Sequence, residues 1–161
     1  MSERTGTRIV VGSDHAGFPL KGRLMEFLRQ RGYQVIDVGS YDPAPVDFPD
    51  VARRLAEKIL GGDADRGLMV CGTGVGASIA ANKIPGIRAA VCHDVHSAHQ
   101  SVEHDDVNVM CIGAQIVGPW LAVDLVDAFV SARFSDDPDC RRRVAKLHEM
   151  DRGLAAARRD G

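Results

Sequence analysis

The chain has 161 residues, a length that suits one compact domain with a sizeable hydrophobic core. Its formal net charge is -2 and its isoelectric point is near 6.3, so the chain presents no overall basic field that would attract nucleic acid or an anionic membrane. No apolar run is long enough to span a bilayer, and the charged N-terminus lacks the apolar stretch of a signal peptide. We therefore expect residues 1–161 to form a single cytoplasmic domain that binds neither nucleic acid nor a membrane.

The cysteines indicate a reducing compartment. They are Cys71, Cys92, Cys111 and Cys140, and no two of them have CxxC spacing. Three lie in or at the end of apolar runs, where a reduced thiol behaves as a small hydrophobic side chain. This usage favours the cytoplasm over an oxidising compartment, in which disulfides would form.

Short apolar runs alternate along the chain with segments of helical period, which is the pattern of βα units that feed a parallel sheet. The expected strands are 8–12, 34–39, 67–72, 88–93 and 108–113, each almost wholly apolar in its middle, as in strands buried on both faces. The expected helices are 17–31, 50–61, 75–82, 95–103, 118–131 and a last one from about 137 to 157. Right-handed crossovers would place helices on both faces of a five-stranded parallel sheet, with the core of the domain at about 8–134.

Two segments depart from this pattern. The stretch 40–50, SYDPAPVDFPD, is rich in Pro and Asp, and we expect it to be a mobile loop at the edge of the sheet. The C-terminal stretch 140–160 is basic and has too few apolar positions for a central core helix. We expect this helix to lean on another surface, such as a second subunit.

The loop after the third expected strand carries the clearest chemical signal, because ligands of open α/β sheets bind beyond the carboxyl ends of the strands. In this loop, CGTGVGAS at 71–78, three glycines at alternating positions let the backbone fold tightly at a helix N-terminus with its N–H groups pointing into a cavity. Such a nest binds an anion or a developing oxyanion. Cys71 lies where the nest begins, which favours a thiolate that acts as base or nucleophile. The alternative is that Cys71 is a buried strand residue, as we expect of Cys92 and Cys111.

Asp14 and His15 follow the first strand at the same edge of the sheet. One interpretation is an N-cap, in which Ser13 or Asp14 binds the first N–H groups of the next helix. The functional interpretation is that the carboxylate orients a hydroxyl while the imidazole supplies a cation or donor to an anionic substrate. His104 is a further candidate for proton transfer, because the neighbouring carboxylates of Asp105 and Asp106 favour its protonated form.

A dinucleotide site is a rival interpretation of the glycine-rich loop. Gly72, Gly74 and Ala77 match the G-x-G-x-x-G/A pattern, and Asp94 lies about twenty residues further on. The pattern nevertheless follows the third strand rather than the first and opens a short helix. The oxyanion nest is therefore the favoured interpretation.

A metal site is the second rival, because histidines cluster in the stretch 93–104. They are His93, His96, His99 and His104. No carboxylate or cysteine recurs among them at a ligand-like interval, so a solvated helix face is favoured for His96 and His99. We predict neither a metal nor a nucleotide cofactor.

Taken together, these motifs resemble the ribose-5-phosphate isomerase B family, which also includes galactose-6-phosphate isomerase subunits. The resemblance runs from about Ile9 to Val144 and is carried by GSDHAG (12–17), DFP (47–49), CGTGVGASIAANKIPGIRAAV (71–91), EHDDVNV (103–109) and RRRVAK (141–146). It implies a Rossmann-like three-layer αβα sandwich and a homodimer, which could pair further into a tetramer. Each active site would be built from both chains, and the C-terminal helix would pack on the partner subunit.

The resemblance also implies an aldose-ketose isomerase that acts on a sugar phosphate. Cys71 would move a proton between adjacent carbons through a cis-enediolate, and Thr73 would help to move the hydroxyl proton. Asp14 and His104 would orient and open the sugar ring. The enediolate oxygen would be held by the amides of Gly72, Gly74, Val75 and Gly76.

The remaining residues implied by the resemblance bind the substrate. His15 and Arg143 would contact the phosphate, with His104 and Arg143 coming from the partner subunit. Asn82, Asp105 and Arg142 complete the expected substrate-binding set.

The chain departs from the family pattern at the phosphate and sugar end rather than at the proton-transfer end. Family members often have Arg in place of Gln115, Arg and His in place of Asp139 and Cys140, Asn in place of Asp105, and Tyr in place of Phe48. Losing an Arg removes a bidentate phosphate contact, for which Arg141 or Arg142 could compensate. The expected substrate is ribose 5-phosphate or ribulose 5-phosphate, with a four-carbon sugar phosphate such as D-erythrulose 4-phosphate, or a six-carbon one, as the alternative.

Three rival function classes follow from the same residues. A module that binds a sugar phosphate without turnover would keep the nest but lose the base, so the presence of Cys71 and Thr73 favours the enzyme. A nicotinamide-dependent oxidoreductase would rest on the dinucleotide pattern alone. A thiol oxidoreductase would need a resolving cysteine, and none is near Cys71 in the sequence.

Overall fold

In the computed structural model, which describes residues 7–159, five parallel strands form one sheet in the order β2-β1-β3-β5-β4. The strands are β1 (Arg8–Ser13), β2 (Gln34–Asp37), β3 (Arg66–Cys71), β4 (Ala89–Val91) and β5 (Val109–Gly113). The helices are α1 (Phe18–Gln30), α2 (Phe48–Leu60), α3 (Val75–Asn82), α4 (Val95–Asp105), α5 (Pro119–Ser131) and α6 (Pro138–Arg159). Every strand and helix expected from the apolar pattern is present, which confirms the α/β fold class.

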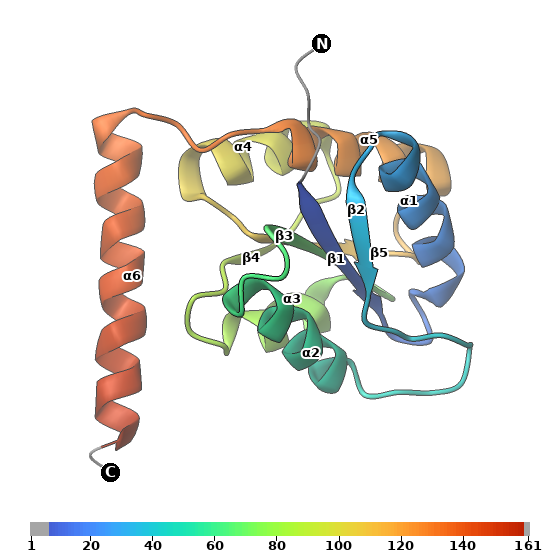
Figure 1. The fold of residues 1–161 in the computed structure, drawn as a ribbon, viewed down its shortest axis with the longest axis horizontal. Coiled ribbons are helices and arrows are strands. Elements are labelled where there is room, and N and C mark those ends of the chain that lie inside the picture. The colour runs from blue at the N-terminus through green and yellow to red at the C-terminus, as the bar shows by residue number, and fades with distance from the viewer. Residues whose placement is uncertain (1–6, 160–161) are drawn as a thin grey trace.

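Two hydrophobic cores, one on each face of the sheet, make the three layers. Because successive strand side chains point to opposite faces, Ile9 and Val11 join one core while Val10 joins the other. The first core is completed by α1, α4 and α5, and the second by α2 and α3. Figure 1 shows these two groups of helices on opposite sides of the sheet. The strands are therefore buried on both faces, as their apolar sequences predict.

Several boundaries differ from the expectation by a few residues, and two of these differences have a clear physical reason. Helix α2 begins at Phe48, inside the stretch expected to be irregular, because Pro49 fits the first turn of a helix, where no N–H bond is lost. Strand β4 is shorter than the expected 88–93. The Arg88 N–H donates to the Asn108 side chain instead of to a strand carbonyl.

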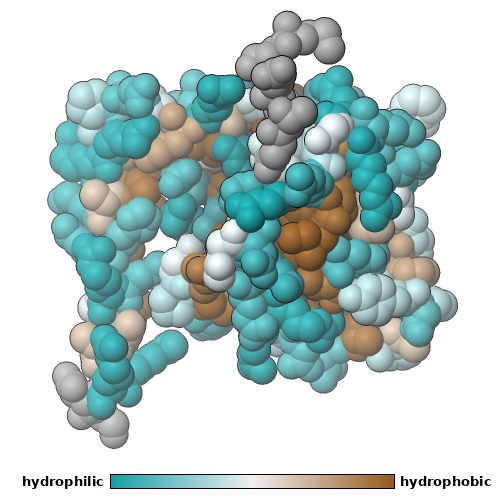
Figure 2. Space-filling model, viewed as in Figure 1, coloured by the Kyte–Doolittle hydropathy of each residue, from teal (hydrophilic) through white to brown (hydrophobic). Residues whose placement is uncertain are grey.

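Helix α6 stands beside the domain rather than within it (Figure 1). Of its side chains, Cys140 and Val144 are buried, whereas Leu147, Met150 and Leu154 are exposed. These three line a groove of about 390 Å³ between α6 and the β4 edge of the sheet, and in the space-filling view an opening separates the mostly hydrophilic α6 from the domain (Figure 2). Within residues 7–159, no helix combines the length and apolar content of a membrane span.

Lys21 fastens the segment after β2 to the first helix. Its side chain is only 3% exposed, and its ammonium donates to the Asp37 carboxylate at 2.7 Å and to the carbonyl oxygen of Ser40. The Ser40 N–H donates in turn to the carbonyl of Ser13 at 2.7 Å. A buried cation with two oxygen acceptors thus fixes the chain beside the end of β1.

We expect Lys21→Met to destabilise the fold by about 2–4 kcal/mol, because it leaves the Asp37 carboxylate without its cation and a buried carbonyl without its donor. Urea denaturation of the purified protein measures this change. The control is Lys58→Met, which removes the exposed pair with Asp63 at 3.2 Å and should cost less than about 1 kcal/mol. Equal losses in the two variants would contradict the role of Lys21.

Candidate active site

Cys71 ends β3, the central strand, with its sulfur inside the glycine-rich loop. The residue is 5% exposed, and its Sγ accepts a hydrogen bond from the Gly74 N–H at 3.1 Å. Gly74 is the N-cap of α3, and the Thr73 hydroxyl oxygen accepts the Val75 N–H at 3.3 Å. A thiolate at this position would meet an N–H donor and the positive end of a helix.

Glycine is required in this loop for reasons that the structure makes specific. Gly74 has a φ of +80°, a left-handed conformation that residues with a Cβ rarely adopt. A Cβ at Gly76 would lie 2.9 Å from the Phe48 ring, and one at Gly72 would lie 3.1 Å from Oε1 of Gln115. The loop is therefore packed closely between α2 and the turn that follows β5.

The other buried cysteines near the sheet have no such environment. Burial raises the pKa of the Cys92 thiol, and burial likewise raises the pKa of the Cys111 thiol. Both residues are core members, as expected from their apolar runs. The thiol that lies inside the glycine-rich loop is Cys71.

Asp14 lies next to Cys71 across the β1–β3 pair. Its N–H donates to the Val70 carbonyl at 3.2 Å, and its carboxylate accepts the Gly17 N–H at 2.9 Å. Gly17 is itself the N-cap of α1, with no side-chain cap, so the N-cap interpretation of Ser13 or Asp14 was wrong. The carboxylate instead holds the turn that leads into the helix.

His15 is exposed at the same edge of the sheet. Its Nδ1 accepts the Val46 N–H at 3.3 Å, from the loop between β2 and α2. Because a backbone N–H can only donate, this bond leaves Nε2 to carry the ring proton in the neutral imidazole. That nitrogen is then a donor for an anionic group.

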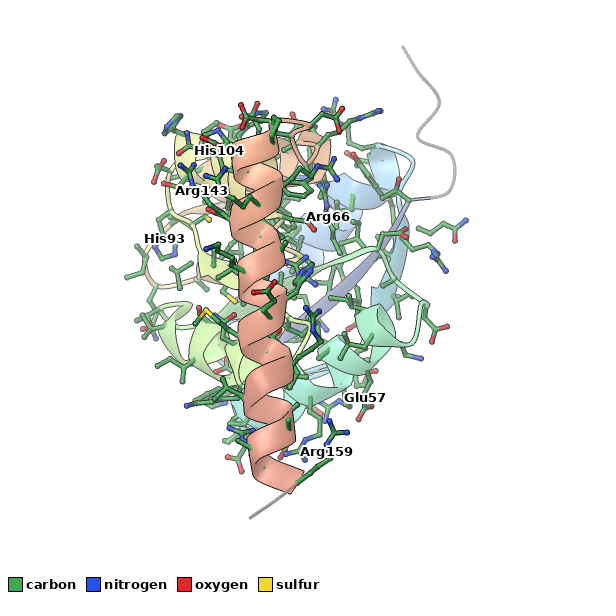
Figure 3. All side chains as sticks on the ribbon, turned by 90° about the vertical axis from the view of Figure 1, so that its left-hand side faces the viewer. Glu57, Arg66, His93, His104, Arg143 and Arg159 are labelled. Carbon is green, nitrogen blue, oxygen red and sulfur yellow. The ribbon has the colours of Figure 1, made fainter. Side chains whose placement is uncertain are left out.

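A second cluster gathers the remaining polar candidates between α4 and α6. His104 and Asp105 end α4, and Arg143 lies on the facing part of α6, beside His104 in Figure 3. Asp139 is 2.5 Å from Arg142 and 3.9 Å from Arg143. The hydrogen bond from Arg142 and the charges of both arginines hold the pKa of Asp139 below its ordinary value.

Asn82, the last residue of α3, has a backbone partner at the edge of the sheet. Its amide donates to the carbonyl of Ala89 at 2.9 Å and accepts the Ala89 N–H at 2.8 Å. This pairing covers the outer edge of β4, which no other strand covers among the described residues. Asn82 also lines the groove under α6, together with Asp105.

Within one chain the two clusters lie at opposite ends of the strands, one at the carboxyl ends and the other at the amino ends. Helices α3 and α4 begin at the carboxyl edge, beside the ends of β3 and β4, and run back antiparallel to the strands. The 11 residues of α4 span about 16 Å, so His104 and Asp105 lie near the start of β5 rather than near its end. The chain therefore brings Cys71, Thr73, Asp14 and His15 to one edge, and leaves Asn82, His104, Asp105, Arg142 and Arg143 at the other.

The rival site types gain no support from the geometry. Asp94, the acidic residue of the dinucleotide pattern, caps α4 by accepting the Ser97 N–H at 2.7 Å, and that bond holds the pKa of Asp94 below its ordinary value. His99 lies 3.3 Å from Glu103 on the exposed face of α4. Among residues 7–159, no three His, Cys, Asp or Glu side chains are grouped as metal ligands.

Sequence reasoning missed the contact of His93. Its Nε2 accepts the Gly113 N–H at 2.9 Å, at the turn that packs against the glycine-rich loop. The position of His93 just after the fourth strand was the available signal, because it places the residue at the carboxyl edge of the sheet.

Comparison with known proteins identifies the family. A family model described as Ribose/Galactose Isomerase matches residues 9–147. The chain belongs to this isomerase family. Ribose-5-phosphate isomerase B of Escherichia coli is 45% identical over 127 residues, covering 79% of this chain and 85% of the relative. D-erythrulose-4-phosphate isomerase of Pectobacterium atrosepticum is 43% identical over 129 residues, covering 78% and 84%.

A solved structure agrees with this assignment. The chain is similar to ribose-5-phosphate isomerase B of Clostridium thermocellum, with a TM-score of 0.89, 44% identity, and coverage of 92% of this chain and 99% of that one. The protein is thus a sugar-phosphate isomerase of the ribose-5-phosphate isomerase B type, as the motifs predicted.

Gly74→Ala should destabilise the protein by about 1–2 kcal/mol, because alanine is strained at positive φ, and it should also reduce isomerase activity. Gly22→Ala is the matched control, since nothing lies within 4 Å of a Cβ in that position of α1, and it should stabilise the fold by about 0.5–1 kcal/mol. Urea denaturation and an isomerase assay measure both effects. A Gly74→Ala variant as stable and active as wild type would show that the loop tolerates another conformation.

Proposed function

We propose that this protein interconverts ribose 5-phosphate and ribulose 5-phosphate, with Cys71 as the base. The observation that carries the proposal is the buried Cys71 sulfur, which lies inside a loop that aims an N–H group at it. A thiolate would remove the proton from C2 of the open-chain aldose. The electron pair of that C–H bond forms the C1–C2 double bond of a cis-enediolate, and the carbonyl oxygen takes the negative charge.

The remaining steps use the groups around Cys71. The amides of Gly72 to Gly76 stabilise the negative oxygen, as preorganised N–H donors do in other acyl and enolate sites. The Thr73 hydroxyl moves the proton between the two oxygens, and the Cys71 thiol returns its proton to C1. Substrate and product have the same atoms and oxidation level, so the reaction needs no external oxidant.

A complete site requires a second copy of the chain. His104, Arg142 and Arg143, which would open the sugar ring and bind the phosphate, lie at the opposite edge of the sheet from Cys71 in the same chain. An exposed apolar surface surrounds the glycine-rich loop and supports an interface there. It consists of Val75, Ile79, Val91 and Val95. We infer a homodimer in which the arginine cluster of one subunit completes the cysteine cluster of the other, with Asp14 and His15 on the cysteine side.

Two features of the chain support a second candidate for the preferred substrate. Gln115 lies beside Gly72, at a position where the family resemblance leads us to expect Arg, and Asp139 pairs with Arg142 and lies near Arg143. Both features reduce the positive charge offered to a phosphate. A relative named D-erythrulose-4-phosphate isomerase is 43% identical, nearly as similar as the Escherichia coli protein. A four-carbon sugar phosphate is therefore the second candidate, and a six-carbon one the third.

We expect purified protein to isomerise at least one phosphate from a panel of four-, five- and six-carbon aldoses and ketoses, with and without EDTA.

Cys71→Ala should lower kcat by about 10³-fold or more, because the base is lost. Cys92→Ala is the matched control, as it removes another buried thiol, and it should retain activity. Turnover of no panel member, or an active Cys71→Ala enzyme, would overturn the proposal.

Mixing two inactive variants tests the shared site. Cys71→Ala and Arg143→Ala subunits should regain about a quarter of wild-type kcat/KM after subunit exchange, because a random mixture is half heterodimer and each heterodimer has one intact site. The control mixture replaces the second variant with the double variant Cys71→Ala/Arg143→Ala, in which no site can be intact. No recovery in the first mixture, once exchange is verified, would mean that each site is built from one chain.

A further inference from the structure

We propose that His93 is a positioning residue for the oxyanion-binding loop. Its ring anchors the turn 113–115, and that turn fixes the backbone of residues 71–73. The effect on activity rests on the proposed function of Cys71 and its loop, whereas the anchoring itself can be observed without any substrate.

The first link is the hydrogen bond from the Gly113 N–H to Nε2 of His93, at 2.9 Å in a partly buried position. The Cys92 N–H donates to the carbonyl of Cys111 at 3.2 Å. In a continued parallel ladder, the next bond would run from the Gly113 N–H to the carbonyl of Cys92. Strand β4 ends at Val91, and the His93 ring supplies the acceptor instead.

The second link joins the turn to the glycine-rich loop by backbone hydrogen bonds. The Ala114 N–H donates to the carbonyl of Cys71 at 2.8 Å, and the Gln115 N–H donates to the carbonyl of Gly72 at 3.0 Å. These bonds extend the β3–β5 pairing past Cys71 and Gly113, which are the last partners in the register. The direction of the Cys71 and Gly72 peptide groups is therefore set by the turn.

The third link is direct backbone packing. A Cβ at Gly113 would lie 2.7 Å from Cα of Thr73, so no side chain separates the two segments. A shift of the turn must consequently move Thr73 and its neighbours. Catalytic donors lose much of their effect when they are misplaced by about 1 Å.

The ring nitrogen must be unprotonated to play this role. A backbone N–H only donates, so Nε2 of His93 has to hold a lone pair, and the proton of the neutral ring is on Nδ1. Nε2 of His93 accepts a backbone N–H, whereas Nε2 of His99 lies 3.3 Å from the Glu103 carboxylate on the exposed face of α4.

Two variants of His93 with side chains of similar size distinguish the loss of the hydrogen-bond acceptor from a change in side-chain volume. His93→Leu fills the space without an acceptor and should lower kcat by about 10-fold or more, with KM changed by less than about 3-fold. His93→Gln keeps a side-chain oxygen that can accept the Gly113 N–H, and its kcat should return to within about 3-fold of wild type. His99→Leu is the control and should leave activity unchanged. Equal kcat values in His93→Leu and His93→Gln, whether both low or both normal, would overturn the proposal.

Nuclear magnetic resonance tests the hydrogen bond between the Gly113 N–H and the His93 ring without any measurement of activity. We expect the Gly113 amide proton to exchange with solvent at least about 10-fold faster in His93→Leu than in wild type, and to stay protected in His93→Gln. The ¹⁵N shifts of His93 should report an unprotonated Nε2 that accepts the Gly113 N–H. Unchanged Gly113 protection in His93→Leu would refute the anchor. If Gly113 loses its protection in His93→Leu but the wild-type protein isomerises no sugar phosphate, the proposed function is refuted and the anchor still stands.

Discussion

The parallel pairing of β3 with β5 is the constraint on which the rest of the molecule depends. These strands lie in the interior of the sheet, and their register places Cys71 opposite Gly113 at the edge where both end. Beyond that point the chain cannot continue as sheet, because Gly74 turns into the left-handed region and α3 begins. The Cys71 sulfur is thus held by the most buried part of the domain, while the N–H group that donates to it belongs to a loop that is free to adopt a special backbone shape.

Much of this arrangement could be predicted from the sequence. The apolar runs, the glycines and the prolines located all strands and helices, and the rule that ligands bind at the carboxyl ends of the strands selected Asp14, His15 and Cys71 from the sequence alone. The α2 boundary was missed because the Pro- and Asp-rich stretch 40–50 was expected to be irregular, whereas Pro49 fits the first turn of a helix that begins at Phe48. The role of Asp94 was also missed, since the same carboxylate fits both a nucleotide pattern and an N-cap.

Other features depend on contacts between distant segments, which local patterns do not encode. Lys21 looks like an ordinary polar residue of an amphipathic helix, yet its ammonium is buried against Asp37 and Ser40. The amide of Asn82 pairs with the backbone of Ala89, and the ring of His93 accepts the N–H of Gly113. In each case a side chain supplies a bond that the backbone would otherwise make, and the need for it arises only when the strands are assembled.

The separation of the two polar clusters has a consequence for how such a protein diversifies. The sulfur and its loop belong to β3 and α3, whereas the arginines belong to α6, which has little contact with the core. Substitutions in α6 can accumulate without disturbing the packing that positions Cys71. If Arg142 and Arg143 bind the substrate as proposed, substitutions at positions such as Asp139 change recognition of the sugar and leave the Cys71 loop unaltered. Substrate preference can then evolve separately from the packing of the domain, which suits a family whose members are named for sugars of four, five and six carbons.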